Sequence, residues 1–343
     1  MNKKLPIGKS PIQCYPDYGT FFGIVDAYTK NYLDWIYNYF IQLVVTENNY
    51  FRVDFCPPRI LKAIPWLDVE KIDRQFVVDT WNSYENFVIE SINHGKYIYA
   101  LMDTAYTYGK NGRHFLHEHL IYGYDDMKYE FYFYDNYANG KYKSGIISFD
   151  DLERANKSLN SNNLTDWYNG IMMLSYINLY DYGNYVFSND HKHIFNKEFA
   201  LELMADYLYE RCTEDRWIPP TVLSSQENKL MQKKCWGIGV YRYAKDYLKY
   251  VDDSTKELEI RGFYAMHEHK KIIKDLIINH FANSGLIIEK CDQNIKISEN
   301  IVLLCLKYNL TNKQNLVGQI RNKLECLQDN DIYIFSHVLN TCE

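Results

Sequence analysis

Aromatic and other apolar residues alternate with polar residues most regularly in the stretch 117–137, which reads HEHLIYGYDDMKYEFYFYDNY. Alternation with a period of two residues is typical of β-strands, and aromatic residues favour strands. Residues 125–128 interrupt the alternation with turn-forming chemistry. The pattern therefore predicts a β-hairpin with one strand on each side of this turn.

The length of the turn decides which residue of the first strand lies opposite Asp135. A two-residue turn pairs Asp135 with Glu118, which points to the other face from His117. A three-residue loop pairs Asp135 directly with His117. The sequence leaves both registers open, and a shift of one residue turns every side chain to the other face. We favour the second register, because it separates two carboxylates and gives the imidazole of His117 a carboxylate partner.

A helix is predicted soon after the N-terminus. Pro16 and Asp17 suit the first turn of a helix, since proline is tolerated there and aspartate favours the positive end of the helix dipole. Gly19, Gly23 and Ala27 follow at intervals of four residues and so share one face. We expect this face to approach another backbone closely.

The remaining elements are predicted from the same two periodicities. The first half is expected to hold strands at 40–46, 50–55 and 96–103, a helix at 69–93, and a capped helix that starts at Ser148. In the second half, helical spacing recurs at 168–181, 197–212, 239–250, 256–283, 298–308 and 312–328. The asparagine-rich stretch 156–166 is predicted to be a linker. We therefore expect an α+β protein, with a mixed domain at 1–155 and a mostly helical domain at 167–343.

Composition narrows the class of protein. The chain has 343 residues, 47% of them hydrophobic, which is enough to bury sizeable cores. A net charge of −6 without a long basic run argues against nucleic acid or an anionic membrane as a partner. The first ten residues lack the apolar core of a signal peptide, and no run is long enough to span a membrane. Eight cysteines lack metal-type spacing. We expect a soluble cytoplasmic protein with free thiols and no membrane partner.

Cys14 is the candidate nucleophile because it lies at the start of the predicted first helix. Free amides and the dipole at a helix N-terminus favour a thiolate and could also stabilise an oxyanion. Cys56 is the rival, but the two prolines that follow it remove two backbone donors. With His117 as base and Asp135 as the group that orients it, Cys14 completes a predicted catalytic triad.

Three pairs of histidines invite a metal-site interpretation. The pair in the hairpin lies on a strand and shares one face, but no further ligand is clustered with it, so we expect no metal there. The pair in the 191–193 region is predicted to lie in a loop and the pair near 267–269 on a helix, where positions two apart face differently. We expect these last two pairs to be solvated surface histidines. The pairs are His117 and His119, His191 and His193, and His267 and His269.

The order of these elements resembles the papain-like cysteine peptidases, including the bacteriocin-leader peptidases. In those families the cysteine opens the first helix, as Cys14 does here. The histidine starts a strand and is followed by a Gly-Tyr-like pair, matched by His117 and residues 123–124. The orienting residue ends the next strand, as Asp135 does.

The resemblance departs from the family pattern at the oxyanion hole. Those families place a glutamine about six residues before the cysteine, where this chain has Gly8. Gln13, directly before Cys14, is the nearest glutamine, and we expect it to be the oxyanion donor.

A closer resemblance comes from HEHLIYGYDD and FYFYDNY followed by ISFDDLERA and a helical second half. This combination is similar to the acyltransferases typified by butirosin biosynthesis protein H, and more closely to papain-like amide synthases of polythioamide (closthioamide) antibiotic biosynthesis. The resemblance implies a papain-like fold with a helical C-terminal extension, and transfer of an acyl or peptidyl chain from a carrier-protein thioester, through an acyl-cysteine, to an amine such as 1,3-diaminopropane. It implies no cofactor other than the phosphopantetheine of the partner carrier protein.

Synthesis requires that water be excluded and the amine held in place. Four residues near the hairpin are the expected substrate-binding residues: Tyr106, Tyr108, Phe115 and His119. Two alternatives remain open at this point, a papain-like cysteine peptidase and a non-catalytic protein that binds a carrier or product.

Overall fold

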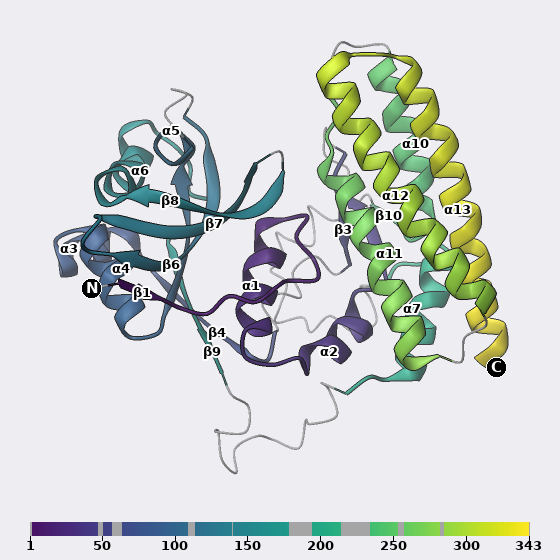
Figure 1. The fold of residues 1–343 in the computed structure, drawn as a ribbon, viewed down its shortest axis with the longest axis horizontal. Coiled ribbons are helices and arrows are strands. Elements are labelled where there is room, and N and C mark those ends of the chain that lie inside the picture. The colour runs from purple at the N-terminus through teal and green to yellow at the C-terminus, as the bar shows by residue number, and fades with distance from the viewer. Residues whose placement is uncertain are drawn as a thin grey trace. The chain divides into compact units, whose positions relative to one another are not determined.

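The chain folds into two compact units in the computed structural model (Figure 1). Residues 2–46, 51–56, 64–108, 114–138, 140–177, 194–213, 234–252, 257–281 and 285–342 are described. Unit 1 comprises Met1–Lys30 and Ile64–Val186, and unit 2 comprises Asn31–Ala63 and Phe187–Glu343. The fold is mixed, with helices and antiparallel sheets, as an α+β protein requires.

This division differs from the expected one at 1–155 and 167–343, because each unit takes two separate pieces of chain. The predicted linker 156–166 is part of unit 1. Arg74 holds it there: its guanidinium donates to Asn156 Oδ1 at 2.7 Å and to Asp166 Oδ2 at 2.6 Å. Asparagine-rich composition did not reveal this packing, because the partner lies more than 80 residues away in the sequence.

Unit 1 is built on one antiparallel sheet. Its strand order is β4-β9-β5-β6-β7-β8, and β1 pairs with β6 beside this path. Every residue of β5 is buried, so this strand forms the middle of the unit. The strands are β1 (Asn2–Lys4), β4 (Leu67–Ile72), β5 (Tyr97–Asp103), β6 (Leu116–Asp125), β7 (Glu130–Ala138), β8 (Lys141–Ser148) and β9 (Ile171–Tyr176).

Five helices accompany this sheet in the described part of unit 1. They are α1 (Pro16–Asp26), α3 (Arg74–Trp81), α4 (Tyr84–Asn93), α5 (Thr104–Thr107) and α6 (Phe149–Ser161). α1 packs on β6 and β7, and α4 and α6 pack on β5. The glycine-bearing face of α1 approaches another backbone at Gly23, whose carbonyl accepts from the N–H of Gly8 at 2.8 Å. At Gly19 it approaches a side chain instead, since a Cβ there would lie 2.7 Å from the ring of Tyr142. The predicted cap is also confirmed, since Ser148 Oγ accepts from the N–H of Asp151 at the start of α6.

One predicted helix is correct only in part, and another is wrong. The stretch 69–93 contains β4 and then two helices, each with its own N-cap, Asp73 for α3 and Ser83 for α4. Asn82 separates them with a left-handed backbone, φ 61°. The stretch 168–181 contains strand β9, which pairs with both β4 and β5. Its apolar spacing fitted either element, and the long-range pairing decided the outcome.

Unit 2 is mostly helical, as expected for the second half (Figure 1). A small antiparallel sheet has the order β10-β2-β3, and α10 and α11 contact it. Its elements are α2 (Tyr32–Tyr39), β2 (Leu43–Thr46), β3 (Val53–Phe55), α7 (Lys197–Leu208), β10 (Lys234–Trp236), α10 (Gly239–Asp252), α11 (Arg261–His280), α12 (Gly285–Thr311) and α13 (Asn315–Cys342).

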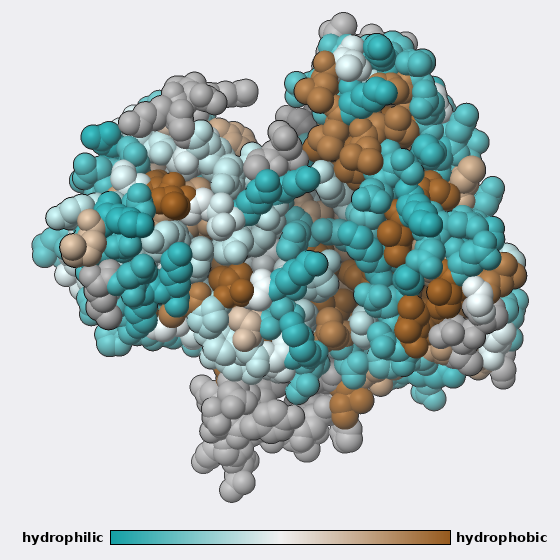
Figure 2. Space-filling view, in the orientation of Figure 1, coloured by the Kyte–Doolittle hydropathy of each residue, from teal (hydrophilic) through white to brown (hydrophobic). Residues whose placement is uncertain are grey.

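The surface of unit 2 carries several exposed apolar side chains, and brown areas are visible over its helices in Figure 2. Leu303 and Leu310 of α12 and Ile332 of α13 are among them. None of the helices in the described ranges is long and apolar enough to cross a membrane.

The core of unit 2 contains a buried charge network. Asp331 accepts hydrogen bonds from Tyr207, Tyr241 and Lys270 on one carboxylate oxygen and from Asn294 on the other. These residues come from five different helices, and all are at most 3% exposed. Burial lowers the pKa of the Lys270 ammonium, and the charge of Asp331 opposes this shift. The network therefore joins the helices through one desolvated ion pair that is compensated by hydrogen bonds.

His269 extends this network, and the burial of two histidines corrects one expectation. His269 accepts from Lys270 through Nδ1 at 3.0 Å and donates through Nε2 to the carbonyl of Ile41 at 2.7 Å. His267 pairs with the hydroxyl of Ser298 at 2.9 Å. Both are buried, so the prediction of solvated surface histidines is wrong for this pair. The pair in the 191–193 region lies outside the described residues.

Replacing Lys270 by methionine should reduce the free energy of unfolding of unit 2 by about 3–5 kcal/mol, because Asp331 is left as an uncompensated buried charge. Lys274→Met is the matched control, since Lys274 lies one turn later on α11 and pairs with the half-exposed Asp292. Its cost should stay below about 1 kcal/mol. Urea unfolding of both variants measures the difference, and equal losses would contradict this account.

Candidate active site

The hairpin formed by β6 and β7 contains a β-bulge. Asp125 pairs with Glu130 next to the turn, whereas Leu120 pairs with Tyr134 further along. The register shifts between Ile121 and Gly123, so Tyr122 is an extra residue in β6. The connection is a four-residue turn, 126–129.

The observed register is neither of the two that the sequence suggested. The prediction that His117 and Asp135 lie directly opposite each other on the two strands is therefore wrong. Continued by one residue beyond the Leu120–Tyr134 pair, the ladder places Asp135 opposite His119, and His117 lies diagonally from it on the same face. Without the bulge Asp135 would lie opposite Leu120, on the other face. The extra residue therefore aims the carboxylate of Asp135 at the imidazoles.

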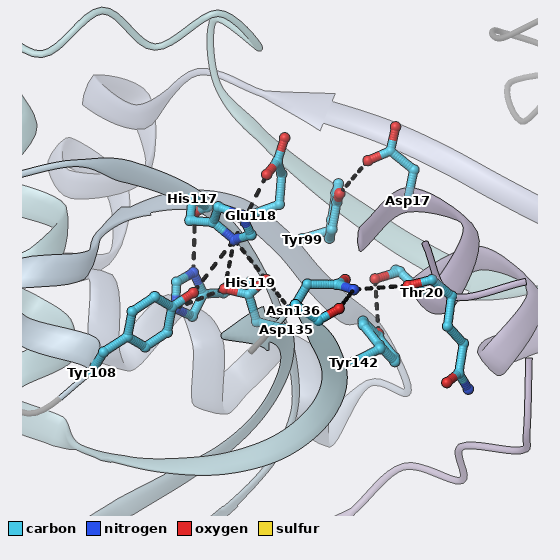
Figure 3. Close-up of polar contacts among 12 residues, drawn as sticks. Asp17, Thr20, Tyr99, Tyr108, His117, Glu118, His119, Asp135, Asn136 and Tyr142 are labelled. Carbon is cyan, nitrogen blue, oxygen red and sulfur yellow. Dashed lines mark hydrogen bonds and ion pairs between the residues drawn. The ribbon is translucent and has the colours of Figure 1, made fainter. Parts of the chain in front are cut away.

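His117 and Asp135 form the expected imidazole–carboxylate pair (Figure 3). His117 Nδ1 lies 2.7 Å from Asp135 Oδ1 and 2.8 Å from Oδ2. The Asp135 side chain is fully buried, while that of His117 is 20% exposed. Burial raises the pKa of the Asp135 carboxyl well above its usual range, and the backbone N–H of Asn136 opposes this shift. The contact with His117 Nδ1 gives this buried carboxyl a hydrogen-bond partner.

His119 lies under this pair and is held neutral. Its Nδ1 donates to the backbone carbonyl of His117 at 3.0 Å, and its Nε2 lies 3.6 Å from Asp135 Oδ2. Burial, with a smaller effect from the charge of His117, lowers the pKa of His119 to about 3. His119 is only 2% exposed. It was predicted to bind substrate, but its burial leaves little surface for direct contact with one.

Two aromatic side chains lie near His117. The hydroxyl of Tyr108 lies 3.4 Å from His117 Nδ1, and its ring stacks on those of His119 and Tyr137. Phe115 is 54% exposed, and its ring centroid lies 6.2 Å from that of His117. The structure thus brings two of the predicted substrate-binding residues, Tyr108 and Phe115, to His117.

The third predicted aromatic residue, Tyr106, lies beside His114 instead, with ring centroids 6.2 Å apart. His114 Nδ1 lies 2.6 Å from Asp103 Oδ2, and Ser158 also donates to this carboxylate. Burial raises the pKa of Asp103, but the hydrogen bonds from Ser158 and His114 lower it overall. Asp103 also accepts from the N–H of Phe115, so it fastens the start of the segment that leads to His117.

Cys14 lies in unit 1, in the same compact unit as His117 and Asp135. It directly precedes Tyr15, the N-cap of α1, and its side chain is 4% exposed. Tyr15 contributes no side-chain cap, and Pro16 occupies the first turn. Cys14 therefore occupies the expected place at the positive end of this helix.

The rival thiol, Cys56, is in unit 2. It follows β3 and is 1% exposed.

Gln13 is held at both its side chain and its backbone. Its Nε2 donates to the carbonyl of Ser10 at 3.3 Å, so one N–H of the predicted oxyanion donor is engaged locally. Its backbone carbonyl accepts from Asn136 Nδ2 at 2.7 Å. This bond joins the segment that carries Cys14 to β7, directly beside Asp135.

Sequence reasoning missed several residues that tie α1 to the sheet. The Tyr168 hydroxyl lies 3.4 Å from Asp17 Oδ1 of α1 and 3.2 Å from Glu118 Oε1 of β6, so its one proton is shared between these carboxylates. Tyr99 donates to Asp17 at 2.7 Å. Asn136 was also missed, because alternation shows only that it points away from Asp135 and does not identify its partner. Glu118 Oε2 lies 3.9 Å from His117 Nδ1 and gives the imidazole a second carboxylate nearby.

Within the described residues, no three His, Cys, Asp or Glu side chains are grouped so that they could hold a metal ion. Around His117, the contacts from Asp135 to Nδ1 fix the orientation of the imidazole.

Replacing His119 by asparagine should make the stability of unit 1 less sensitive to acid. The unfolded chain binds a proton at this histidine below about pH 6.5, whereas the folded chain does so only near its lowered pKa of about 3, so acid favours unfolding. Between about pH 6.5 and pH 5, the variant should lose about 2 kcal/mol less unfolding free energy than the wild type. Urea unfolding at several pH values measures this. An equal loss in both proteins would show that His119 is not held neutral.

A comparison with models of known protein families finds no match to this sequence. A comparison with curated proteins likewise finds no match. The case for a function therefore depends on the chemistry of the residues around His117 and Cys14.

Proposed function

We propose that this chain is a cysteine-dependent acyltransferase that forms amide bonds. Cys14 is the nucleophile, His117 the general base and Asp135 the residue that orients it. The observation that carries the proposal is the His117–Asp135 pair, in which a buried carboxylate contacts Nδ1 at 2.7 Å and orients the imidazole. Nε2 is the nitrogen that we propose takes part in proton transfer. Cys14 at the start of α1, in the same unit, supplies the thiol.

The order of these elements supports a papain-like fold for unit 1. The cysteine precedes a helix that packs on the two antiparallel strands carrying the histidine and the aspartate. The backbone of Gln13 is bound to β7 beside Asp135, which relates the cysteine segment to the second strand of the hairpin.

The proposed first step transfers the acyl group to the enzyme. His117 takes the proton of the Cys14 thiol, and the thiolate attacks the thioester carbonyl of an acyl or peptidyl chain on a carrier protein. The new carbon–sulfur bond to Cys14 forms as the bond to the pantetheine sulfur breaks. The pantetheine thiolate leaves and takes the proton back from His117.

The second step transfers the acyl group to an amine, with 1,3-diaminopropane as the proposed acceptor. The amine nitrogen attacks the acyl-cysteine carbonyl while His117 takes one of its protons. The carbon–nitrogen bond forms, the carbon–sulfur bond breaks, and the proton on His117 returns to Cys14. Tyr108 and Phe115, beside His117, are proposed to exclude water so that the amine is the nucleophile.

The oxyanion of each step needs hydrogen-bond donors. We propose the backbone N–H groups that follow Pro16 at the start of α1, together with the side chain of Gln13. One N–H of Gln13 already donates to Ser10, so the second N–H, or a rotation of the side chain, is required.

Intact-protein mass spectrometry with S-acetyl- and S-benzoyl-pantetheine tests the proposal. The wild type should gain one acyl group that 1,3-diaminopropane removes as an amide, whereas Cys14→Ala should gain none. Asp135→Asn should slow acylation by about 10³- to 10⁴-fold, because the imidazole loses the partner that fixes its tautomer.

Cys56→Ala is the control, since this thiol belongs to unit 2 and should not affect the adduct. An adduct that water discharges equally fast without amine would indicate a hydrolase. The absence of any adduct with competent thioesters would refute covalent catalysis.

A further inference from the structure

Asn136 follows Asp135 in β7 and contacts two other parts of unit 1. Its side-chain Nδ2 donates to the backbone carbonyl of Gln13 at 2.7 Å and to that of Gly140 at 3.1 Å. Its backbone N–H donates to the carboxylate of Asp135. Neighbouring residues of a strand point to opposite faces. Asp135 therefore contacts His117, as Figure 3 shows, and Asn136 contacts the segment that carries Cys14.

The orientation of the Asn136 amide follows from its partners. Both contacts are carbonyl oxygens, which only accept, so the NH₂ group must face them and a flipped amide would place three acceptors together. Asn136 Oδ1 is buried and has no hydrogen-bond partner within the described residues. Burying an acceptor without a partner costs free energy. The two hydrogen bonds donated by Nδ2 offset this cost and so hold the amide in place.

The contact with Gln13 acts directly on the proposed nucleophile. The carbonyl of Gln13 and the N–H of Cys14 belong to one planar peptide group. A hydrogen bond that fixes this carbonyl therefore fixes the plane from which the Cα and the thiol of Cys14 extend. Asn136 also donates its backbone N–H to Asp135. One residue of β7 therefore contacts both the segment that carries the nucleophile and the carboxylate that orients His117.

We propose that Asn136 is a positioning residue that sets Cys14 relative to the His117–Asp135 pair. This inference rests on the proposed function. Beyond that function, it states that the side-chain amide of Asn136 fixes where Cys14 lies relative to His117. Proton transfer between a thiol and an imidazole depends steeply on their separation, and a displacement of about 1 Å can reduce a rate by about 10²-fold.

Asn136→Ala separates the two contacts, because it removes the side-chain amide and keeps the backbone N–H that donates to Asp135. Asn136→Asp keeps the size of the side chain and removes the donor. We expect both variants to retain the low-field ¹⁵N-coupled proton signal of His117 Nδ1, which reports the pair with Asp135. We expect acylation of Cys14 by S-benzoyl-pantetheine to fall by about 10²-fold.

A substrate-free readout keeps this inference separate from the proposed function. The rate of Cys14 alkylation by iodoacetamide, followed by peptide mass mapping across pH 5–10, reports the coupling of the thiol to His117. In Asn136→Ala this profile should approach that of His117→Ala. Asn86→Asp is the control, since Asn86 also donates to a backbone carbonyl in unit 1 but lies on α4.

The inference is overturned if both Asn136 variants keep the wild-type alkylation profile while folded, as judged by thermal melting. Loss of the His117 Nδ1 signal in both variants would also overturn it, since the amide would then support the pair instead of the cysteine. Failure of wild-type Cys14 to accept an acyl group would refute the proposed function, and the alkylation profiles would still report the role of Asn136.

Discussion

The extra residue in β6 is the constraint on which the site depends. Tyr122 shifts the register of the hairpin by one residue, and only after that shift does Asp135 share a face with His117 and His119. The next residue, Gly123, is tightly packed against β1, because a Cβ there would lie 2.6 Å from the carbonyl of Lys3. The bulge is thus held between β7 on one side and β1 on the other, and the position of the carboxylate follows from strand pairing.

Both units bury charge, and they compensate for it in different ways. In unit 2, Asp331 is satisfied by a lysine, two tyrosines and an asparagine, so the group is fully engaged within the helices. In unit 1, Asp135 contacts the imidazole of His117, which is partly exposed. A closed network of the first kind specifies packing. An open pair of the second kind suits proton transfer to a substrate.

The region around His117 combines an oriented imidazole with aromatic side chains. Tyr108 and Phe115 lie beside the imidazole. Asp103, the last residue of β5, accepts a hydrogen bond from the N–H of Phe115. Amide synthesis by an acyl-enzyme needs both features, because the base must activate the thiol and the amine while water is kept away. The proposed role of Asn136 adds a third requirement, a fixed position for the thiol.

The sequence by itself determined the elements whose signals are local. The helix after Pro16, the cap at Ser148 and the aromatic hairpin follow from spacing and turn chemistry, whereas the contact of His117 with Asp135 needed the bulge as well. The tertiary structure decided everything that depends on contacts between distant residues. These include the bulge, strand β9, the attachment of residues 31–63 to unit 2, the burial of His269 and the bond from Asn136 to Gln13. Local periodicity shows which face a side chain occupies, but it carries no information about what meets that face.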